Sequence, residues 1–281
     1  MRNAWAPLVR PASLLLSVVF AAAGLSALPT AQSASERQQA PVRTPNISRM
    51  PDGKPDLSGL WQSLTTANWD LLDHGPQPSP FYQLGAIGAE PSGQGVVEGN
   101  EIPYQPWAAA KKKENFVNRL TQDPEVKCYM PGLPRATYMP FPFQIVQGTT
   151  YIEMAYEFAT ANRPIRMQKH TEPPVDTWMG WSNGHWDGDT LVVDVTGFND
   201  QTWFDRAGDF HSDALHLVER YTPVSREIIQ YEATIEDPKV FTRPWKISMP
   251  LYRRVEKNVA FLDFKCVEYT EELLYGKLTT R

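Results

Sequence analysis

Apolar and polar residues alternate in short runs along the second half of the chain. In 226–236, Ile229, Tyr231, Ala233 and Ile235 occupy one face, and polar or charged residues occupy the other. This period of two is typical of a β-strand with one buried face. Similar runs, separated by turn residues, lie at about 143–148, 150–158, 163–169, 181–186, 189–197, 215–222, 246–253 and 259–268. Eight or nine short strands at this spacing predict an all-β fold, either a barrel or a sandwich.

The clearest connection between two of these strands is Asp187-Gly188. An Asp-Gly pair between two apolar runs is the strongest short-range signal for a tight β-hairpin, because such a turn requires positive φ angles. After this pair, Leu191, Val193 and Val195 alternate with partly polar neighbours. We therefore expect an antiparallel hairpin with one fully apolar face.

The first half of the chain predicts mostly irregular structure. Residues 35–55 are polar, contain proline and lack periodicity, which is typical of a flexible lead-in. Residues 56–104 contain many glycines and prolines, so we expect an extended arm lying across the domain. The turn and apolar pair at 55–61 predict a short strand or plug at the start of this arm.

One helix is expected, at about 106–122. Pro106 suits a first helical turn, and the alanine and lysine run after it has high helix propensity. Residues 56–281 are therefore predicted to form a single β-rich domain, with the barrel at about 143–269.

The first 34 residues have the features of a secretory signal peptide. Arg2 and Arg10 supply a basic start, residues 14–28 are apolar and uncharged, and 31–33 offer small residues at the positions that a signal peptidase reads. A retained membrane anchor is the alternative, but the stretch is short and rich in alanine and glycine for a span. We therefore expect a periplasmic or secreted protein with no membrane association after cleavage.

Charge and cysteine content narrow the possible partners and the compartment. The formal net charge is −5, and loss of the two leader arginines makes it about −7, which argues against a nucleic-acid partner. Cys128 and Cys266 are the only cysteines, and in an oxidising compartment they predict a disulfide. Two free buried thiols are the alternative. Closing so long a loop contributes about 4 to 5 kcal/mol in the chain-entropy model.

The motifs of several enzyme classes are absent. The sequence has no Gly-x-Gly-x-x-Gly after a strand, no phosphate-binding loop and no Gly-x-Ser-x-Gly elbow. It also has no His-Glu-x-x-His or Cys-x-x-Cys motif. We therefore expect no cofactor and no metal. A metal site assembled from distant residues, for instance His170 with His211 and Asp213, is the alternative.

Acid–base groups are concentrated in the segment after the predicted hairpin. His211 is flanked by Asp209 and Asp213, and a carboxylate near an imidazole orients its tautomer and raises its pKa. We predict that His211 is a general base and that Asp213 or Asp205 orients it. The alternative is a surface histidine in an Asp-rich loop, with Ser212 and Asp213 capping a helical turn.

Glu219 lies in the middle of a predicted strand, where a charged residue is costly to bury unless it is paired. It is predicted either as an acid that stabilises developing charge or as a structural ion-pair partner. We expect Arg163 or Arg166 to hold an anionic part of a substrate. Aromatic and polar residues that either line a pocket or fill the core are further candidates for substrate binding. They are His170, Trp178, Trp186, Asn199 and Trp203.

Several motifs together resemble a large family of mostly uncharacterised secreted bacterial proteins. They are PDLSGLW at 55–61, GHWDGDTLVV at 184–193, GFN at 197–199 and HSDAL at 211–215, followed by Glu219-Arg220. The resemblance extends from about residue 51 to residue 269. It implies a secreted or periplasmic β-rich, lipocalin-like fold, and it specifies no reaction.

The leading hypothesis is a periplasmic, cofactor-free enzyme that acts by proton transfer on a small apolar or aromatic molecule in a β-barrel pocket. It would be a lyase, an isomerase or a hydrolase, with His211, Asp213 and Glu219 as its central groups. One alternative is a ligand carrier without chemistry, in which the same loop closes the mouth of the barrel. Another is a structural partner of other periplasmic proteins that docks through residues 62–104.

Overall fold

The computed structural model describes residues 46–81, 84–85 and 89–276. The predicted signal peptide, residues 1–34, lies outside the described residues and stays a prediction. The described end of the predicted lead-in makes a turn in which Arg49 bridges to Pro55. Arg49 also forms an ion pair with Asp189 at 2.7 Å, which places this turn beside the hairpin that contains Gly188.

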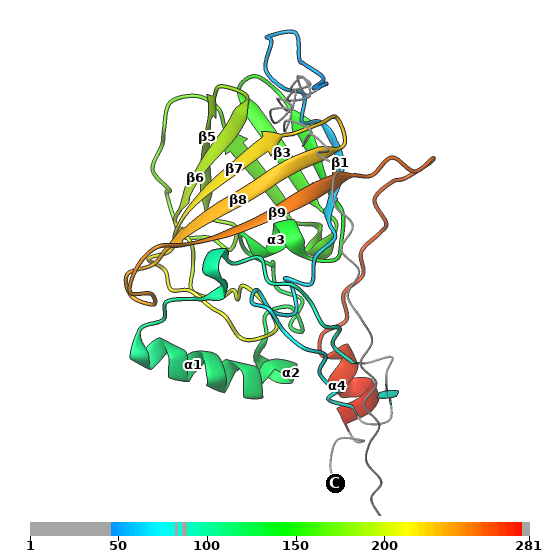
Figure 1. The fold of residues 1–281 in the computed structure, drawn as a ribbon, viewed down its shortest axis with the longest axis vertical. Coiled ribbons are helices and arrows are strands. Elements are labelled where there is room, and N and C mark those ends of the chain that lie inside the picture. Colours follow the sequence, from blue (N-terminus) through cyan, green and yellow to red (C-terminus); the bar gives the residue numbers. More distant parts are fainter. Residues whose placement is uncertain (1–45, 82–83, 86–88, 277–281) are drawn as a thin grey trace, which may run out of the picture. The chain divides into compact units, whose positions relative to one another are not determined.

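Nine strands form a closed barrel (Figure 1). Neighbouring strands pair antiparallel, except that β4 and β5 run parallel, and β1 closes the barrel by pairing with both β2 and β9. The strands are β1 Gly59–Ser63, β2 Phe143–Gln147, β3 Tyr151–Tyr156, β4 Asn162–Arg166, β5 Trp181–Asp187, β6 Thr190–Thr196, β7 His216–Pro223, β8 Ile228–Glu236 and β9 Trp245–Arg253. The prediction of an all-β fold is confirmed, with a lipocalin-like barrel rather than a sandwich.

The alternation read from the sequence separates the inside of the barrel from its outside. In β7 and β8 every second residue is buried. Leu217 pairs with Ile235 across these strands, and Tyr221 pairs with Tyr231. These four side chains have no solvent exposure, so they fill the barrel interior. The apolar face predicted in 226–236 is therefore the inner face.

The predicted hairpin is also confirmed, but its turn lies one residue later than the predicted Asp187-Gly188 pair, and of its two residues only Gly188 has a positive φ angle. Asp187 at the end of β5 pairs with Thr190 at the start of β6, which leaves Gly188 and Asp189 as a two-residue turn. Gly188 has φ +59°, in the left-handed region that glycine enters without a Cβ clash.

Two predictions about the extent of the barrel need correction. The barrel was expected at about 143–269, but β1 belongs to it and lies within the predicted arm. The last strand ends at Arg253. Residues 259–268, expected to be a strand, make no ladder, because both edges of β9 are already paired, with β8 and with β1. Their aromatic residues pack instead, as Phe264 does against Phe158 with ring centroids 4.9 Å apart.

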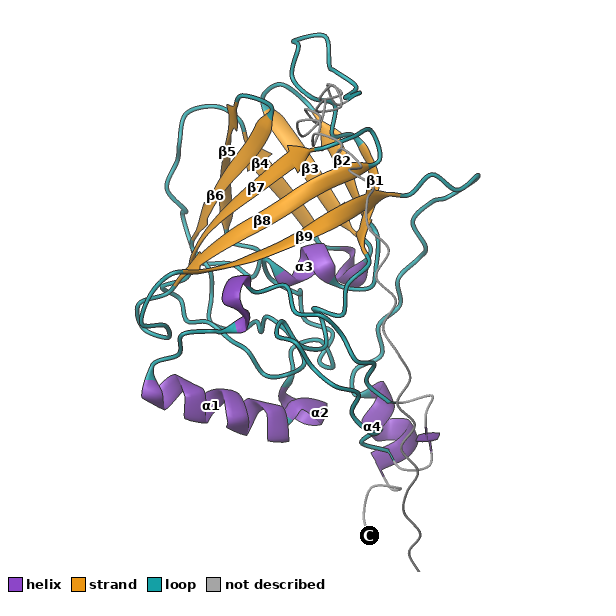
Figure 2. Cartoon of the chain, in the orientation of Figure 1, coloured by secondary structure: helices purple, strands orange, loops and turns teal. Residues whose placement is uncertain are grey.

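The single helix expected at about 106–122 is two helices, α1 Pro106–Val117 and α2 Arg119–Gln122. They are separated at Asn118, where ψ is 11° and the side-chain amide donates to the carbonyl of Glu114 at 2.9 Å. Asparagine side chains compete in this way with the backbone bonds of a helix. Two further helices were not predicted, α3 Arg135–Tyr138 and α4 Thr270–Tyr275. In Figure 2, α3 lies at the lower end of the barrel, with α1 and α2 beneath it.

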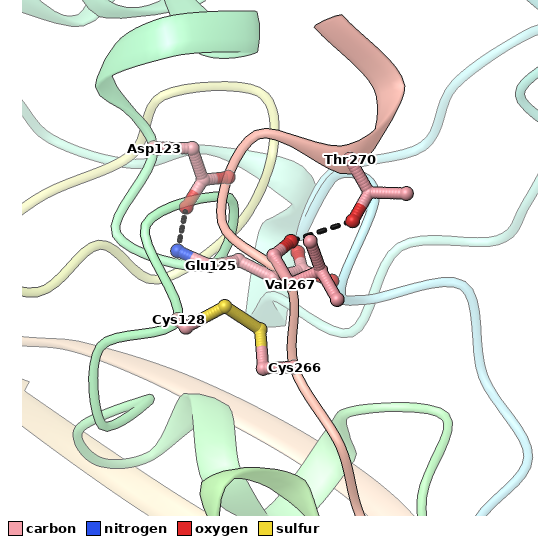
Figure 3. The surroundings of a disulfide bond; sticks show 6 residues. All are labelled: Asp123, Glu125, Cys128, Cys266, Val267 and Thr270. Atoms are coloured by element: carbon pink, nitrogen blue, oxygen red, sulfur yellow. Dashed lines mark hydrogen bonds between the residues drawn. A yellow bond between two sulfur atoms is a disulfide. The ribbon is translucent and has the colours of Figure 1, made fainter. Parts of the chain in front are cut away.

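The predicted disulfide is confirmed: Cys128 is bonded to Cys266 with a Cα–Cα distance of 5.8 Å (Figure 3). The backbone amide of Tyr269 also donates to the carbonyl of Val126 at 2.8 Å. The C-terminal segment that follows β9 is thereby tied to the segment after α2. The disulfide-bonded pair is typical of proteins in an oxidising compartment.

An ion pair lies inside the barrel. Arg163 on β4 donates from its Nη2 atom to Glu219 on β7, and both side chains are almost completely buried. The hydroxyls of Tyr221 and Tyr231 donate to the other oxygen of Glu219 at 3.0 and 2.7 Å, and Arg163 donates to Ser182 at 2.8 Å. Burial opposes the charge of Arg163, but the carboxylate of Glu219 outweighs it and raises the arginine pKa.

We expect Glu219→Gln to lower the free energy of unfolding by about 3 to 5 kcal/mol, because it leaves the charge of Arg163 buried without a carboxylate. Urea unfolding followed by circular dichroism measures this loss. Arg220→Gln is the matched control, since Arg220 pairs with Asp187 on the exposed side of the same strand. A loss for Glu219→Gln no larger than that of the control would contradict the interpretation.

Candidate functional site

The loop of residues 199–212, between β6 and β7, holds four of the eleven predicted site residues: Asn199, Trp203, Asp205 and His211. Trp203 and Phe210 bridge each other across the loop. Asp205 closes it, because one carboxylate oxygen accepts the amide of Asp209 at 3.0 Å and the other accepts the amide of Leu71 at 2.9 Å. Asp205 is fully buried, so the predicted partner of His211 instead holds the loop in shape.

The 199–212 loop packs directly on α1. Gly208 has φ +89°, and a Cβ atom there would lie 2.8 Å from the carbonyl oxygen of Lys112 and from the amide nitrogen of Phe116. Only glycine permits this approach of one backbone to another. The side chain of Asn115 secures it by donating to the carbonyl of Gly208 at 3.1 Å.

A groove of about 540 Å³ lies between α1 and the loop, and we refer to it as the α1 groove. Its aromatic side chains are Trp107, which is 55% exposed, and the half-buried Trp203 and Phe210. The rings of Trp107 and Phe210 meet edge to face, with centroids 5.9 Å apart. The remaining lining residues are Ala110, Lys111, Glu114, Asn115, Asp200, His211 and Ser212.

A second hollow of about 470 Å³ continues the α1 groove along the helix. Both hollows are lined by Lys111, Glu114, Asn115, Asp200 and Trp203. We include this second hollow in the α1 groove, which thus has an aromatic end and a more polar end. The volumes of the two hollows are in the range of small-molecule sites, and aromatic side chains line one end.

His211 borders the α1 groove and is otherwise buried. Its Nδ1 atom lies 2.8 Å from the carbonyl oxygen of Ser212, so Nδ1 holds the proton and donates it. Its Nε2 atom then accepts from the hydroxyl of Thr202 at 2.6 Å. Burial lowers the pKa of His211, so the ring is neutral near pH 7.

The three residues predicted as a catalytic group do not converge. Asp213 is exposed and pairs with Lys239 at 2.6 Å, so it does not orient His211. Glu219 lies inside the barrel with Arg163. His211 alone of the three borders the α1 groove.

The predicted substrate-binding residues are similarly dispersed. Arg163 is inside the barrel, and Arg166 stacks on Trp181 at 3.2 Å from the ring centroid. Of this set, only Trp203 lines the α1 groove. The others lie elsewhere: His170 is exposed beside Glu172, Trp178 packs on Tyr129, Trp186 lies under Lys54, and the side chain of Asn199 accepts the amide of Gln201.

Sequence reasoning missed the contribution of α1. Trp107 lies in the predicted helix but was not a site candidate, and its ring, 55% exposed, lines the α1 groove. The contact that brings α1 to the loop joins Asn115 to Gly208, which are 93 positions apart. The one available signal was a helix whose aromatic residues, Trp107 and Phe116, do not share an apolar face.

One cluster of carboxylates could supply oxygen ligands to a cation. Single oxygen atoms of Asp70, Asp205 and Asp209 lie within 4.8 Å of one another. Lys112 already brings a positive charge to within 3.7 Å of Asp209, and the hydroxyl of Tyr104 donates to Asp209 at 2.6 Å. Burial, and then the neighbouring Asp209, raise the pKa of Asp205 well above its usual value. The alternative metal site, with His170, His211 and Asp213, is not assembled, because both nitrogens of His211 are already engaged.

Comparison with models of protein families gives no match, and no curated protein matches the sequence. Among the described residues, no helix combines the length and the hydropathy that crossing a membrane requires.

Two histidines, His216 and His211, should affect the pH dependence of the free energy of unfolding in opposite directions. On the outer face of β7, His216 lies 2.9 Å from Asp194 and 3.4 Å from Glu236. Burial opposes its charge, but the two carboxylates outweigh it and raise the pKa of His216. His216 therefore contributes stability that is present below pH 6.5 and lost as the pH rises through its folded pKa. The lowered pKa of His211 means that its contribution is lost as the pH falls below 6.5.

We expect His211→Gln to reduce the loss of stability on acidification and His216→Gln to increase it. Urea unfolding of the wild type and both variants at about pH 7.5 and about pH 5.5 measures both effects. Each variant serves as the control for the other, since both replace a histidine by glutamine. A change of the same sign in both variants would contradict the assignment.

Proposed function

We propose that this protein binds a small, mainly aromatic molecule in the α1 groove, outside the barrel. The observation on which the proposal rests is the set of three aromatic side chains, Trp107, Trp203 and Phe210, that line a groove of about 540 Å³. Side chains of this kind supply a large apolar contact area, while the carboxylate of Asp200 in the lining can contact a polar part of a ligand.

The barrel interior is a poorer candidate for the ligand site. Its inward-facing side chains are buried against one another, and the Arg163–Glu219 pair with its tyrosine hydroxyls occupies part of the interior. A ligand there would have to displace hydrogen-bonded charges, which is costly. We therefore place binding in the α1 groove rather than in the lumen favoured by the leading hypothesis.

Acid–base catalysis at His211 is a second candidate function, supported by the Thr202–His211 hydrogen bond. A neutral imidazole that accepts a hydroxyl at 2.6 Å is placed to take its proton, and the carbonyl of Ser212 holds the required tautomer. A lyase, isomerase or hydrolase would use such a group. Binding without chemistry is favoured, because Thr202 is buried and both ring nitrogens already have partners in the chain.

We further propose that the protein works in the periplasm or is secreted, as the predicted signal peptide implies. The disulfide between Cys128 and Cys266 supports this location, since the cytosol keeps most thiols reduced. The acidic net charge supports a small molecule rather than a nucleic acid as the partner.

We expect the neutral fluorescent probe N-phenyl-1-naphthylamine to bind saturably, with a rise in its emission on transfer to the apolar groove. Trp203→Ala and Phe210→Ala should each weaken binding about fivefold or more, because each removes a ring that the probe contacts. Trp186→Ala is the matched control, as Trp186 lies on the β5–β6 hairpin and does not line the groove. Equal effects of all three substitutions, or no saturation, would contradict the proposed site.

The second candidate function predicts slow hydrolysis of 4-nitrophenyl acetate that depends on His211. His211→Gln should abolish this turnover while probe binding and the circular dichroism spectrum remain, because glutamine cannot serve as the base. Asp213→Asn should leave turnover unchanged, since Asp213 pairs with Lys239 on the surface. Equal rates for the wild type and His211→Gln would exclude His211 as the base for this ester.

A further inference from the structure

We propose that the α1 groove selects organic cations, namely aromatic or alkyl ammonium compounds, over neutral and anionic molecules of the same size. This inference rests on the proposed binding function and specifies its ligand class. Two features support cation selectivity: the charges that line the groove and the aromatic rings that have no cation over them.

The charged groups of the groove favour a positive ligand. Lys111 is the one basic residue in the lining near its aromatic end, and its Nζ atom is paired with Glu114 at 3.0 Å. Asp200 is exposed at the rim, and it makes no ion pair with any described residue within 4.0 Å. His211 is neutral because burial lowers its pKa. One carboxylate, Asp200, is therefore left without a matched charge.

The nearby cations do not cancel this charge. Lys239 lies close enough to Asp200 for the carboxylate to raise the lysine pKa, but Asp213 is its direct partner and has the larger effect on that pKa. Lys127 lies at the other, polar end, where it lines only the second hollow and donates to the uncharged side chain of Gln122 at 3.1 Å. An anionic ligand would have to compete with Glu114 for Lys111, whereas a cation finds Asp200 unpaired.

The aromatic rings point to the same ligand class. Five rings in the described part of the chain have an arginine or lysine over them, at 3.2 to 5.9 Å from the ring centroid. No described lysine or arginine lies over Trp107, Trp203 or Phe210. The negative face of an aromatic ring attracts ammonium groups, and several rings around one site are a recurring means of binding quaternary ammonium ligands. In the described part of the chain, none of these three rings therefore has a cation of its own.

The test compares three ligands that share a phenyl ring: benzyltrimethylammonium, benzyl alcohol and phenylacetate. Each is titrated into the full-length protein by calorimetry and by displacement of N-phenyl-1-naphthylamine. We expect benzyltrimethylammonium to bind at least tenfold more tightly than benzyl alcohol, and phenylacetate to bind most weakly. Raised salt should weaken the cation most, because the attraction of an exposed carboxylate is screened.

Two variants separate the contributions of charge and ring. Asp200→Asn should weaken benzyltrimethylammonium about fivefold and leave benzyl alcohol unchanged, whereas Trp203→Leu, which keeps an apolar side chain, should also weaken the cation more than the alcohol. Glu227→Gln is the matched control: it removes one negative charge from an exposed position in the turn between β7 and β8 and should change neither ligand.

The outcomes distinguish failure of this inference from failure of the proposed function. Equal affinities for the three ligands, tighter binding of phenylacetate, or equal effects of Asp200→Asn and Glu227→Gln would overturn cation selectivity while binding in the groove stands. Absence of saturable binding by all three ligands and by the naphthylamine probe would overturn the proposed function, and the inference with it.

Discussion

Closure of the barrel by β1 is the constraint on which the remaining architecture depends. This five-residue strand pairs with β2 on one side and β9 on the other, so the nine strands leave no unpaired edge. Closure encloses the inward side chains, and these include the hydrogen-bonded Arg163–Glu219 pair. With the interior occupied in this way, a ligand site must lie outside the barrel, as the α1 groove does.

The polar residues that the sequence suggests for catalysis mainly stabilise the 199–212 loop. Asp205 accepts two backbone amides, and His211 donates to one carbonyl and accepts one hydroxyl. A buried polar group requires such partners, because leaving one unsatisfied costs more than a typical hydrogen bond contributes. Because acid–base residues form strong hydrogen bonds, they can shape a loop as well as catalyse a reaction. The sequence alone does not distinguish these two roles.

The parts of the fold that were predictable are those determined by local periodicity. Alternation in 226–236 and the turn at Gly188 identified inner faces and the hairpin, since both depend on neighbouring residues. The role of β1 was harder to predict because its partner strands lie more than 80 positions away in the sequence. Residues 259–268 form no strand because β8 and β1 already pair with the two edges of β9. In the site, Trp203 and His211 were found from the sequence. Trp107 was not assigned to it, because the contact of Asn115 with Gly208 is visible only in three dimensions.

The absence of a Cβ atom at Gly208 affects how this site can evolve. Because the loop meets the helix backbone to backbone and Asn115 secures the contact, the spacing of the two walls does not depend on the other side chains that face the ligand. Residues such as Trp107, Asp200 and Trp203 are then free to diverge among descendants of this protein without altering the frame that holds them. Ligand preference and fold stability would evolve almost separately, provided that Gly208 and Asn115 are both retained.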